Sequence, residues 1–325
     1  MSSPTKTADL VENVLSAMRD SSATGDPTAV GRLGSTPPPA PAAPKVKTST
    51  VTDKVIMRPN GEAYHVRKVG TLGHDDVGVL REARAAGVYL LNYGPPGTGK
   101  TAMIEAAYAP IKADGTSDGL YTVQGSGDTE VSDFVGGYIP MPNGSFVWED
   151  GPLLKAMEEG KPLYIDEIAL IDPKVLAIVY GVMDGRRELR VTSNPERGVV
   201  IAQEGFYVCA AQNPNAPGAR MSEALLSRFT MQLLVTTDFT LARKLGVNNK
   251  AVTAALNLDK KLQADEVSWA PQLRELLAFK KLEDLFGTQF ALNNMVSTAP
   301  EIDRKVVADV LSRSFATSVS ELKLA

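Results

Sequence analysis

The sequence predicts an α/β domain built on a parallel β-sheet and followed by a small α-helical domain. The first indication is the segment 94–101, Gly-Pro-Pro-Gly-Thr-Gly-Lys-Thr, which fits the phosphate-binding pattern G-x-x-x-x-G-K-[ST]. The second is an apolar strand at 161–167 that ends in two adjacent acids. The third is a change after residue 238, where strand-like alternation stops and helical stretches continue toward the C-terminus.

The composition is that of a globular protein with room for more than one domain. The 325 residues are 43% apolar, enough to bury the core of a large α/β domain and of a smaller one. The formal net charge of -4 gives no electrostatic reason to expect a polyanion as partner. One cysteine, Cys209, leaves no intramolecular disulfide framework, and two histidines form no zinc-ligand cluster.

No segment approaches the roughly 18 consecutive apolar residues that a membrane helix needs. The N-terminus also lacks the charged and then apolar layout of a signal peptide. The sequence therefore predicts a cytoplasmic protein without a membrane segment.

The first 50 residues are predicted to stand apart from the domains. Apolar residues within 8–19 recur at helical spacing and predict one amphipathic helix. The segment 35–44 is half proline and lies in a stretch of Gly, Ser, Thr and Ala, which predicts an extended linker. The helix docks on a partner, frays in solution or lies on the protein's own surface.

The phosphate-binding pattern, or Walker A motif, lies in the setting that its chemistry needs. An apolar strand at 88–91 precedes it, and good helix-forming sequence at 102–107 follows it. Its glycines let backbone N–H groups point at phosphate oxygens beside the positive end of the helix. Lys100 would reach the β- and γ-phosphates of ATP, and the hydroxyl of Thr101 would bind Mg²⁺. The predicted nucleotide-binding residues are Gly94, Pro95, Pro96, Gly97, Thr98, Gly99, Lys100 and Thr101.

The two acids that end the strand at 161–167 form the Walker B pattern. Because side chains alternate along a strand, the two carboxylates can do different work. Asp166 is predicted to help hold the magnesium ion, and Glu167 to polarise the attacking water.

Further elements are predicted from the alternation and turn residues around these motifs. The glycine- and aromatic-rich segment 133–148 is expected to be an exposed loop with aromatic tips. Strands around a polar turn at 188–202 predict a hairpin. A buried strand at 206–210 leads to Asn213, which either orients water near the γ-phosphate or is an ordinary turn asparagine.

The domain prediction follows from these elements. Residues 1–50 hold the amphipathic helix and the proline-rich linker. Residues 51–238 form the α/β nucleotide domain, and residues 239–325 form a helical lid.

Taken in order, the Walker motifs, the turn at 212–214, the segment 226–229 and the helical tail resemble the AAA+ ATPases. Within them the chain looks most similar to the MoxR group of the dynein-related branch. That narrower resemblance rests on Phe-Val-Gly-Gly-Tyr at 134–138, on Asp-Gly-Pro-Leu-Leu-Lys-Ala at 150–156, and on the hairpin before Asn213. The similarity covers about residues 70–280.

The resemblance implies roles for several polar residues. Asn213 would be sensor 1, Arg228 the arginine finger given to a neighbouring subunit, and Arg274 sensor 2. Arg220 lies near the same expected subunit boundary and could exchange roles with Arg228. The family also implies a homo-oligomeric ring, typically of six subunits, with the region around Gly136 as an insert that faces a central pore.

The function expected from the residues and the resemblance is ATP hydrolysis coupled to remodelling or activation of a protein partner. Family members often act beside a protein that carries a von Willebrand factor A domain, and some insert metals, so a metal-chelatase-type motor subunit is one alternative. A nucleic-acid motor is another, although residues 136–149 contain no Lys or Arg beside their aromatic residues. A non-hydrolysing scaffold is disfavoured by the two intact acids, Asp166 and Glu167.

Overall fold

The computed structural model describes residues 51–324. The amphipathic helix predicted at 8–19 and the proline-rich linker lie outside the described residues. Residues 51–324 belong to one compact unit. None of the helices between residues 51 and 324 is long and apolar enough to cross a membrane.

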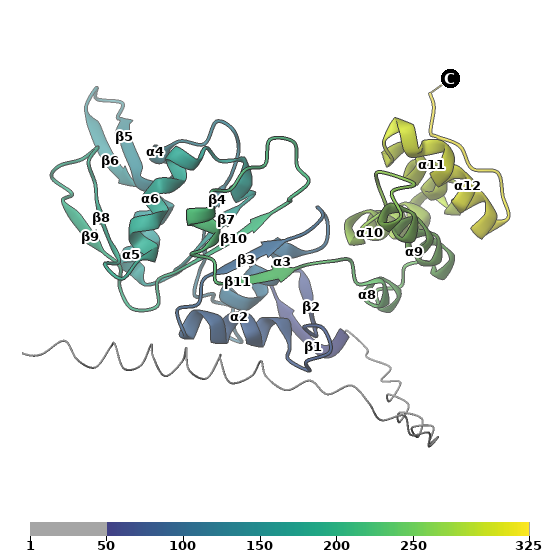
Figure 1. The fold of residues 1–325 in the computed structure, drawn as a ribbon, viewed down its shortest axis with the longest axis horizontal. Helices are drawn as coiled ribbons and strands as arrows, with labels where there is room; N and C mark the ends of the chain where they lie inside the picture. Colours follow the sequence, from purple (N-terminus) through teal and green to yellow (C-terminus); the bar gives the residue numbers. More distant parts are fainter. Residues whose placement is uncertain (1–50, 325) are drawn as a thin grey trace, which may run out of the picture. The chain divides into compact units, whose positions relative to one another are not determined.

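A five-stranded parallel sheet forms the centre of the nucleotide domain, with the strand order β11-β3-β10-β7-β4 (Figure 1). All five strands therefore place their carboxyl ends at the same edge, where open α/β sheets bind ligands. The strands are β3 (Leu90–Tyr93), β4 (Tyr121–Gln124), β7 (Pro162–Asp166), β10 (Tyr207–Gln212) and β11 (Met231–Leu234). This confirms the predicted fold class, a parallel-sheet α/β domain followed by a helical part.

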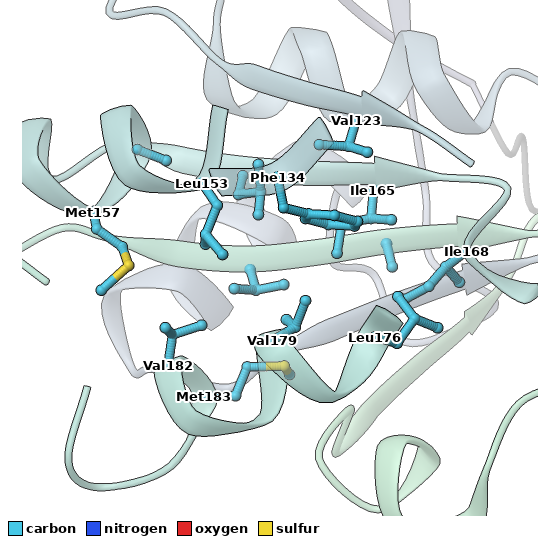
Figure 2. Close-up of a cluster of buried hydrophobic side chains, with 14 of the residues drawn as sticks. Val123, Phe134, Leu153, Met157, Ile165, Ile168, Leu176, Val179, Val182 and Met183 are labelled. Carbon is cyan, nitrogen blue, oxygen red and sulfur yellow. The ribbon is translucent and has the colours of Figure 1, made fainter. Parts of the chain in front are cut away.

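Helices cover both faces of this sheet, which explains why its inner strands are mostly apolar. On one face Leu90 packs with residues of α2 (Asp76–Ala85) and α3 (Lys100–Tyr108). On the other face Leu91 packs with residues of α5 (Pro152–Glu159) and α6 (Pro173–Met183), and Figure 2 shows Leu153, Met157 and Val179 in that cluster. Cys209 is fully buried on β10 as a small core residue.

Three antiparallel hairpins accompany the sheet. The predicted hairpin at 188–202 is present as β8 (Glu188–Arg190) and β9 (Val199–Ile201). The segment expected to be an exposed loop is instead the short helix α4 (Val131–Val135) and a second hairpin. The third hairpin precedes α2 and is not predicted from the sequence. The strands of these two hairpins are β5 (Gly136–Pro140), β6 (Phe146–Asp150), β1 (Val51–Met57) and β2 (Ala63–Arg67).

The difference at 136–150 has a local cause. Gly144 adopts a positive φ of 83°, so the Pro-Asn-Gly sequence closes a tight turn between the strands. Tyr138 then pairs with Trp148, and their rings meet edge to face with centroids 5.2 Å apart. Cross-strand aromatic pairs of this kind stabilise a hairpin that the proline and glycine content alone would disfavour.

The segment that follows the sheet is helical, as the sequence predicts. Its own apolar cluster is formed by residues between 239 and 319, separate from the clusters on the sheet. The helices are α8 (Phe239–Lys244), α9 (Asn249–Gln263), α10 (Leu273–Phe286), α11 (Thr288–Thr298) and α12 (Arg304–Phe315), with a short 3₁₀ turn, η2 (Glu301–Asp303), before the last (Figure 1). We call residues 239–319 the lid.

Candidate nucleotide-binding site

The Walker A segment 94–101, which we call the P-loop, connects the end of β3 to the start of α3. Gly97 and Gly99 have φ values of 79° and 90°, in the left-handed region that glycine enters without strain. At Gly94 an added Cβ would lie 2.3 Å from the carbonyl oxygen of Val235, so no side chain fits there. The loop thus curls tightly enough to leave its backbone N–H groups at the start of α3, the arrangement that binds phosphate.

Lys100 is the charged centre of this loop. Its Nζ donates hydrogen bonds to the carbonyl oxygens of Gly94 and Pro95, at 2.9 and 2.8 Å. Burial lowers the pKa of the ammonium, while the nearby carboxylates of Glu167 and Asp166 act in the opposite direction. The two Walker B acids therefore lie close enough to Lys100 to interact with its charge.

The hydroxyl of Thr101 and the carboxylate of Asp166 meet directly. Thr101 Oγ1 lies 3.1 Å from Asp166 Oδ2 and 3.2 Å from the hydroxyl of Tyr164. Asp166 ends β7 and Thr101 lies in the first turn of α3, so sheet and helix together set this contact. The two predicted metal ligands are thus side by side.

The side chain of Glu167 makes a different contact from that of Asp166. Its backbone has a positive φ of 48°, which is unusual for a residue with a side chain. Its Oε2 accepts a hydrogen bond of 3.3 Å from the backbone N–H of Asn213, which follows β10. The structure therefore brings Glu167 and Asn213 together at the sheet edge, beside Asp166.

The two candidate arginine fingers lie in different surroundings. Arg228 Nη1 donates to the carbonyl oxygen of Ala224 at 2.7 Å, and its guanidinium carbon lies 4.7 Å from the ring centroid of Tyr180. Arg220 is exposed, and its side chain makes no hydrogen bond or ion pair within residues 51–324. Neither arginine lines the cavity that contains the P-loop.

A cavity of about 540 Å³ joins the P-loop and the Walker B acids to the lid. Arg274 lines it from the first turn of α10, and its backbone N–H donates to the carbonyl oxygen of Gly97 at 3.1 Å. The cavity continues along an apolar wall that sequence reasoning missed. That wall is formed by Ala63 and His65 of β2 and by Leu241, Leu245, Leu273 and Leu277 of the lid.

A buried arginine, also missed from the sequence, connects the parts of this site. Arg67 Nη1 donates to the carbonyl oxygen of Thr98 in the P-loop at 3.3 Å and to that of Thr236, ahead of the lid, at 3.5 Å. Its Nε lies 3.4 Å from Asp76, whose backbone begins α2. No local motif marks Arg67; alternation in β2 would have put it on the same face as His65.

Among the described residues, no group of three or more His, Cys, Asp or Glu side chains is arranged to hold a metal ion. A metal at this site would therefore need oxygen ligands of other kinds, such as the Thr101 hydroxyl and substrate phosphates. Mg²⁺ is typically bound in this way, through one or two carboxylates together with phosphate oxygens.

The fold and the site together define an α/β domain with a P-loop and a helical lid. Residues 89–229 match the family model of the AAA domain (dynein-related subfamily). The matched segment carries the Walker motifs, Asn213 and both candidate fingers. The match supports the broader resemblance drawn from the sequence; the narrower MoxR assignment stays a proposal.

Similar proteins are found in staphylococci. The chain is 36% identical over 167 residues to an uncharacterized protein of Staphylococcus haemolyticus, covering 49% of this chain and 60% of the other. It is 39% identical over 156 residues to an uncharacterized protein of Staphylococcus epidermidis, covering 46% and 55%. The aligned part spans little more than half of these relatives' length.

Among solved structures, the chain resembles that of a "putative ATPase" from Cytophaga hutchinsonii. The identity is 14% and the TM-score 0.39, over 75% of this chain and 89% of the other. The fold assignment above rests on the strand order and the family match.

Proposed function

We propose that this chain binds ATP together with Mg²⁺ and hydrolyses it to ADP and phosphate. The main support for this proposal is that three groups of residues lie around one cavity. These are the P-loop with Lys100, the Thr101–Asp166 contact, and the Glu167–Asn213 contact. Each supplies a different requirement of phosphoryl transfer: phosphate binding, metal binding and positioning of water.

The residues present fit a magnesium ion. Octahedral coordination with bonds of 2.0 to 2.1 Å places neighbouring ligand oxygens about 3 Å apart. The 3.1 Å between Thr101 Oγ1 and Asp166 Oδ2 matches that spacing. Thr101 and Asp166 would hold the ion, which would supply positive charge against the charge that develops on the phosphate.

The protein's own groups account for the remaining chemistry. The P-loop N–H groups and Lys100 hold the phosphates, which fixes the γ-phosphate in line for attack. The Glu167 carboxylate, oriented by the Asn213 backbone, would orient water and take its proton. Arg274 would add positive charge from the lid, so closure of the lid on nucleotide would complete the site.

We further propose that the chain works as a homo-oligomeric ring, six subunits in the family it resembles. Neither Arg228 nor Arg220 lines the cavity of its own chain, which favours action on a neighbour's nucleotide. A ring supplies such a neighbour to every subunit.

The substrate that this proposal favours is a protein, engaged through the β5–β6 hairpin. Tyr138 and Phe146 expose 52% and 66% of their surface there. Because residues 136–149 include no lysine or arginine, this surface fits a polypeptide better than a nucleic acid. A MoxR-type role beside a von Willebrand factor A domain protein, or a metal-chelatase-type role, would both fit this mode.

Magnesium-dependent ATP hydrolysis by the purified chain tests the proposal. Lys100→Ala should abolish binding of a fluorescent ATP analogue and hydrolysis, because the cradle then lacks its cation. Lys112→Ala is the matched control, since Lys112 pairs with Asp118 at the surface and does not line the cavity. Hydrolysis that persists in Lys100→Ala, or that is absent from the native ring with Mg²⁺ present, would contradict the proposal.

A further inference from the structure

A second pocket lies at the opposite edge of the sheet from the P-loop. Tyr89 and Phe206, which immediately precede β3 and β10, line a cavity of about 630 Å³. We call it the amino-edge pocket. β3 has four residues, so Tyr89 and Gly94 are roughly 16 Å apart at the usual strand rise. A nucleotide in the P-loop cavity therefore leaves the amino-edge pocket free.

Three arginines converge on the amino-edge pocket, and each is held in place by backbone carbonyl groups. Arg81 donates from Nε to Ala107 at 2.9 Å and from Nη2 to Ala106 at 3.2 Å, in the last turn of α3. Arg84 donates from Nε and Nη2 to Gly205, at 3.1 and 2.9 Å.

The third arginine is held more loosely. Arg187 donates from Nη2 to Gln203 at 3.1 Å and to Phe206 at 3.4 Å. These carbonyl contacts fix the positions of the guanidinium groups but leave their charge without a carboxylate partner.

The charge of this pocket is unbalanced. None of the three arginines forms an ion pair with another residue of the 51–324 segment, whereas their neighbour Arg186 pairs with Asp184 at 2.9 Å. Of the two acids that line the pocket, Asp118 is paired with Lys112, which leaves Glu204 against three guanidinium groups. The local field therefore favours an anion.

The guanidinium groups also have N–H donors that form no hydrogen bond. The Nη1 groups of Arg81, Arg84 and Arg187 make no hydrogen bond with the described part of the chain, and neither does Nε of Arg187. That Nε is buried from solvent, so it has lost water without gaining an acceptor. Because that Nε is closed to solvent, a ligand in the pocket would be held through the Nη1 groups.

Tyr89 and Tyr108 line the pocket and pack on the buried Tyr207. The ring of Tyr89 stacks on that of Tyr207 with centroids 5.7 Å apart, and Tyr108 meets Tyr207 edge to face at 5.5 Å. Tyr89 is half-buried and lines the pocket, so one ring is open to a ligand above a rigid aromatic layer.

We propose that the amino-edge pocket binds a small organic anion. Its phosphate or carboxylate group would be held by Arg81, Arg84 and Arg187, and its flat apolar part would lie on Tyr89. Guanidinium groups suit both anions, because their planar fork donates two parallel hydrogen bonds. This site is additional to the proposed ATPase site and does not depend on it.

Phenyl phosphate is a suitable probe, because it combines a phosphate with a flat ring. Its binding to the full chain would be measured by calorimetry with and without saturating ADP and Mg²⁺. We expect a component of binding that persists with ADP present. Loss of all binding on adding ADP would place the probe in the P-loop and overturn the proposal.

Charge-removing variants test the pocket itself. Arg187→Gln and Arg81→Gln should each weaken the persistent component roughly tenfold or more, as expected for loss of a charge-assisted hydrogen bond. Arg186→Gln removes the same charge one residue away, outside the pocket, and should change affinity less than about twofold. Equal weakening in Arg186→Gln, or none in the other two, would overturn the proposal. Arg81 is exposed, so its variant should fold even if Arg187→Gln does not.

Two further ligands separate the parts of the proposal. Comparing benzoate with phenyl phosphate shows whether the pocket prefers a carboxylate or a phosphate. A preference for one of the two anions is consistent with the proposed site. Phenol carries the ring without the anion and should bind at least about tenfold more weakly. Phenol binding as tight as that of both anions would show an apolar crevice and overturn the anion site.

Discussion

The backbone N–H of Arg274 donates to the carbonyl oxygen of Gly97 across 3.1 Å, so the first turn of the lid helix α10 lies directly on the P-loop. An ideal Cβ on Gly97 would lie 2.9 Å from the Cβ of Arg274. A loop that binds phosphate and a helix that bears a candidate sensor are therefore in contact. A change in the conformation of the P-loop should therefore shift the first turn of α10.

Gly97→Ala should loosen the lid in the nucleotide-free protein. The added Cβ pushes against Arg274, and a left-handed alanine is strained by about 1 to 2 kcal/mol. Amide hydrogen exchange at residues 273–277 should accelerate about tenfold or more. Gly99→Ala is the matched control, because Gly99 is also left-handed but no protein atom lies within 4 Å of its added Cβ. Equal acceleration in both variants would mean that strain in the loop, not the contact with Arg274, controls the lid.

Glu167→Gln should separate nucleotide binding from hydrolysis. Glutamine keeps a side-chain oxygen that can accept from Asn213, so the phosphate and metal contacts stay in place. It cannot accept the proton of water, so hydrolysis should slow at least ~100-fold while ATP affinity stays near normal. Single-turnover hydrolysis and equilibrium binding measure the two effects. If Glu167→Gln lost ATP binding as completely as Lys100→Ala, Glu167 would be a binding residue.

The P-loop half of the site could be predicted from the sequence because its residues are neighbours along the chain. Segment 94–101 and the acids at 166–167 carry recognisable spacing, and each motif ends or follows a strand of one parallel sheet. The strand order then brings them together without further information.

The other half could not be predicted in this way. Its wall combines β2 with leucines of α8 and α10, which are about 180 to 210 residues away in the chain. Leu241 and Leu245, like Leu273 and Leu277, have the i, i+4 spacing of ordinary core residues. Arg67 is likewise recognisable only once the P-loop and the residues before the lid lie on either side of it.

Mixing experiments should test the proposal that Arg228 or Arg220 acts on a neighbouring subunit. Arg228→Ala and Lys100→Ala should each be nearly inactive alone, yet together they form interfaces that pair an intact P-loop with an intact Arg228. Partial recovery of ATPase activity is the expected result. No recovery despite demonstrated co-assembly would count against Arg228 acting in trans.

Arg220→Ala mixed with Lys100→Ala is the parallel experiment. Arg228 contacts Ala224 and Tyr180, whereas the exposed Arg220 is free of side-chain partners in the described structure. Arg228→Ala therefore loses a packing contact as well as a charge, and its melting temperature must be compared with that of Arg220→Ala. Recovery with Arg220→Ala but not with Arg228→Ala would assign the trans role to Arg220.

The aromatic residues of the β5–β6 hairpin should differ in what their loss affects. Trp148 is half-buried, packs against the core and donates from Nε1 to Asp150 at 2.6 Å. Asp150 in turn pairs with Arg197, and that hydrogen bond holds the pKa of the Asp150 carboxyl below its usual value. Cutting a fully buried aromatic residue to alanine typically costs about 3 to 5 kcal/mol of stability. Because Trp148 is only half-buried, Trp148→Ala should lower the free energy of unfolding by roughly half of that amount.

Tyr138→Ala removes the ring contact with Trp148 and should loosen the hairpin locally, but it should keep the overall fold, the proposed ring and the proposed basal ATPase activity while turnover stimulated by the proposed protein partner is lost. Tyr138 is 52% exposed and its hydroxyl forms no hydrogen bond with a described residue, so its removal should shift the melting temperature little. Tyr138→Phe keeps the ring and should keep stimulation, which separates apolar contact from the hydroxyl. Single-stranded DNA is the second control, because a hairpin without lysine or arginine should not respond to it at physiological salt. Strong stimulation by DNA that disappears in Tyr138→Ala would favour a nucleic-acid motor over a protein remodeller.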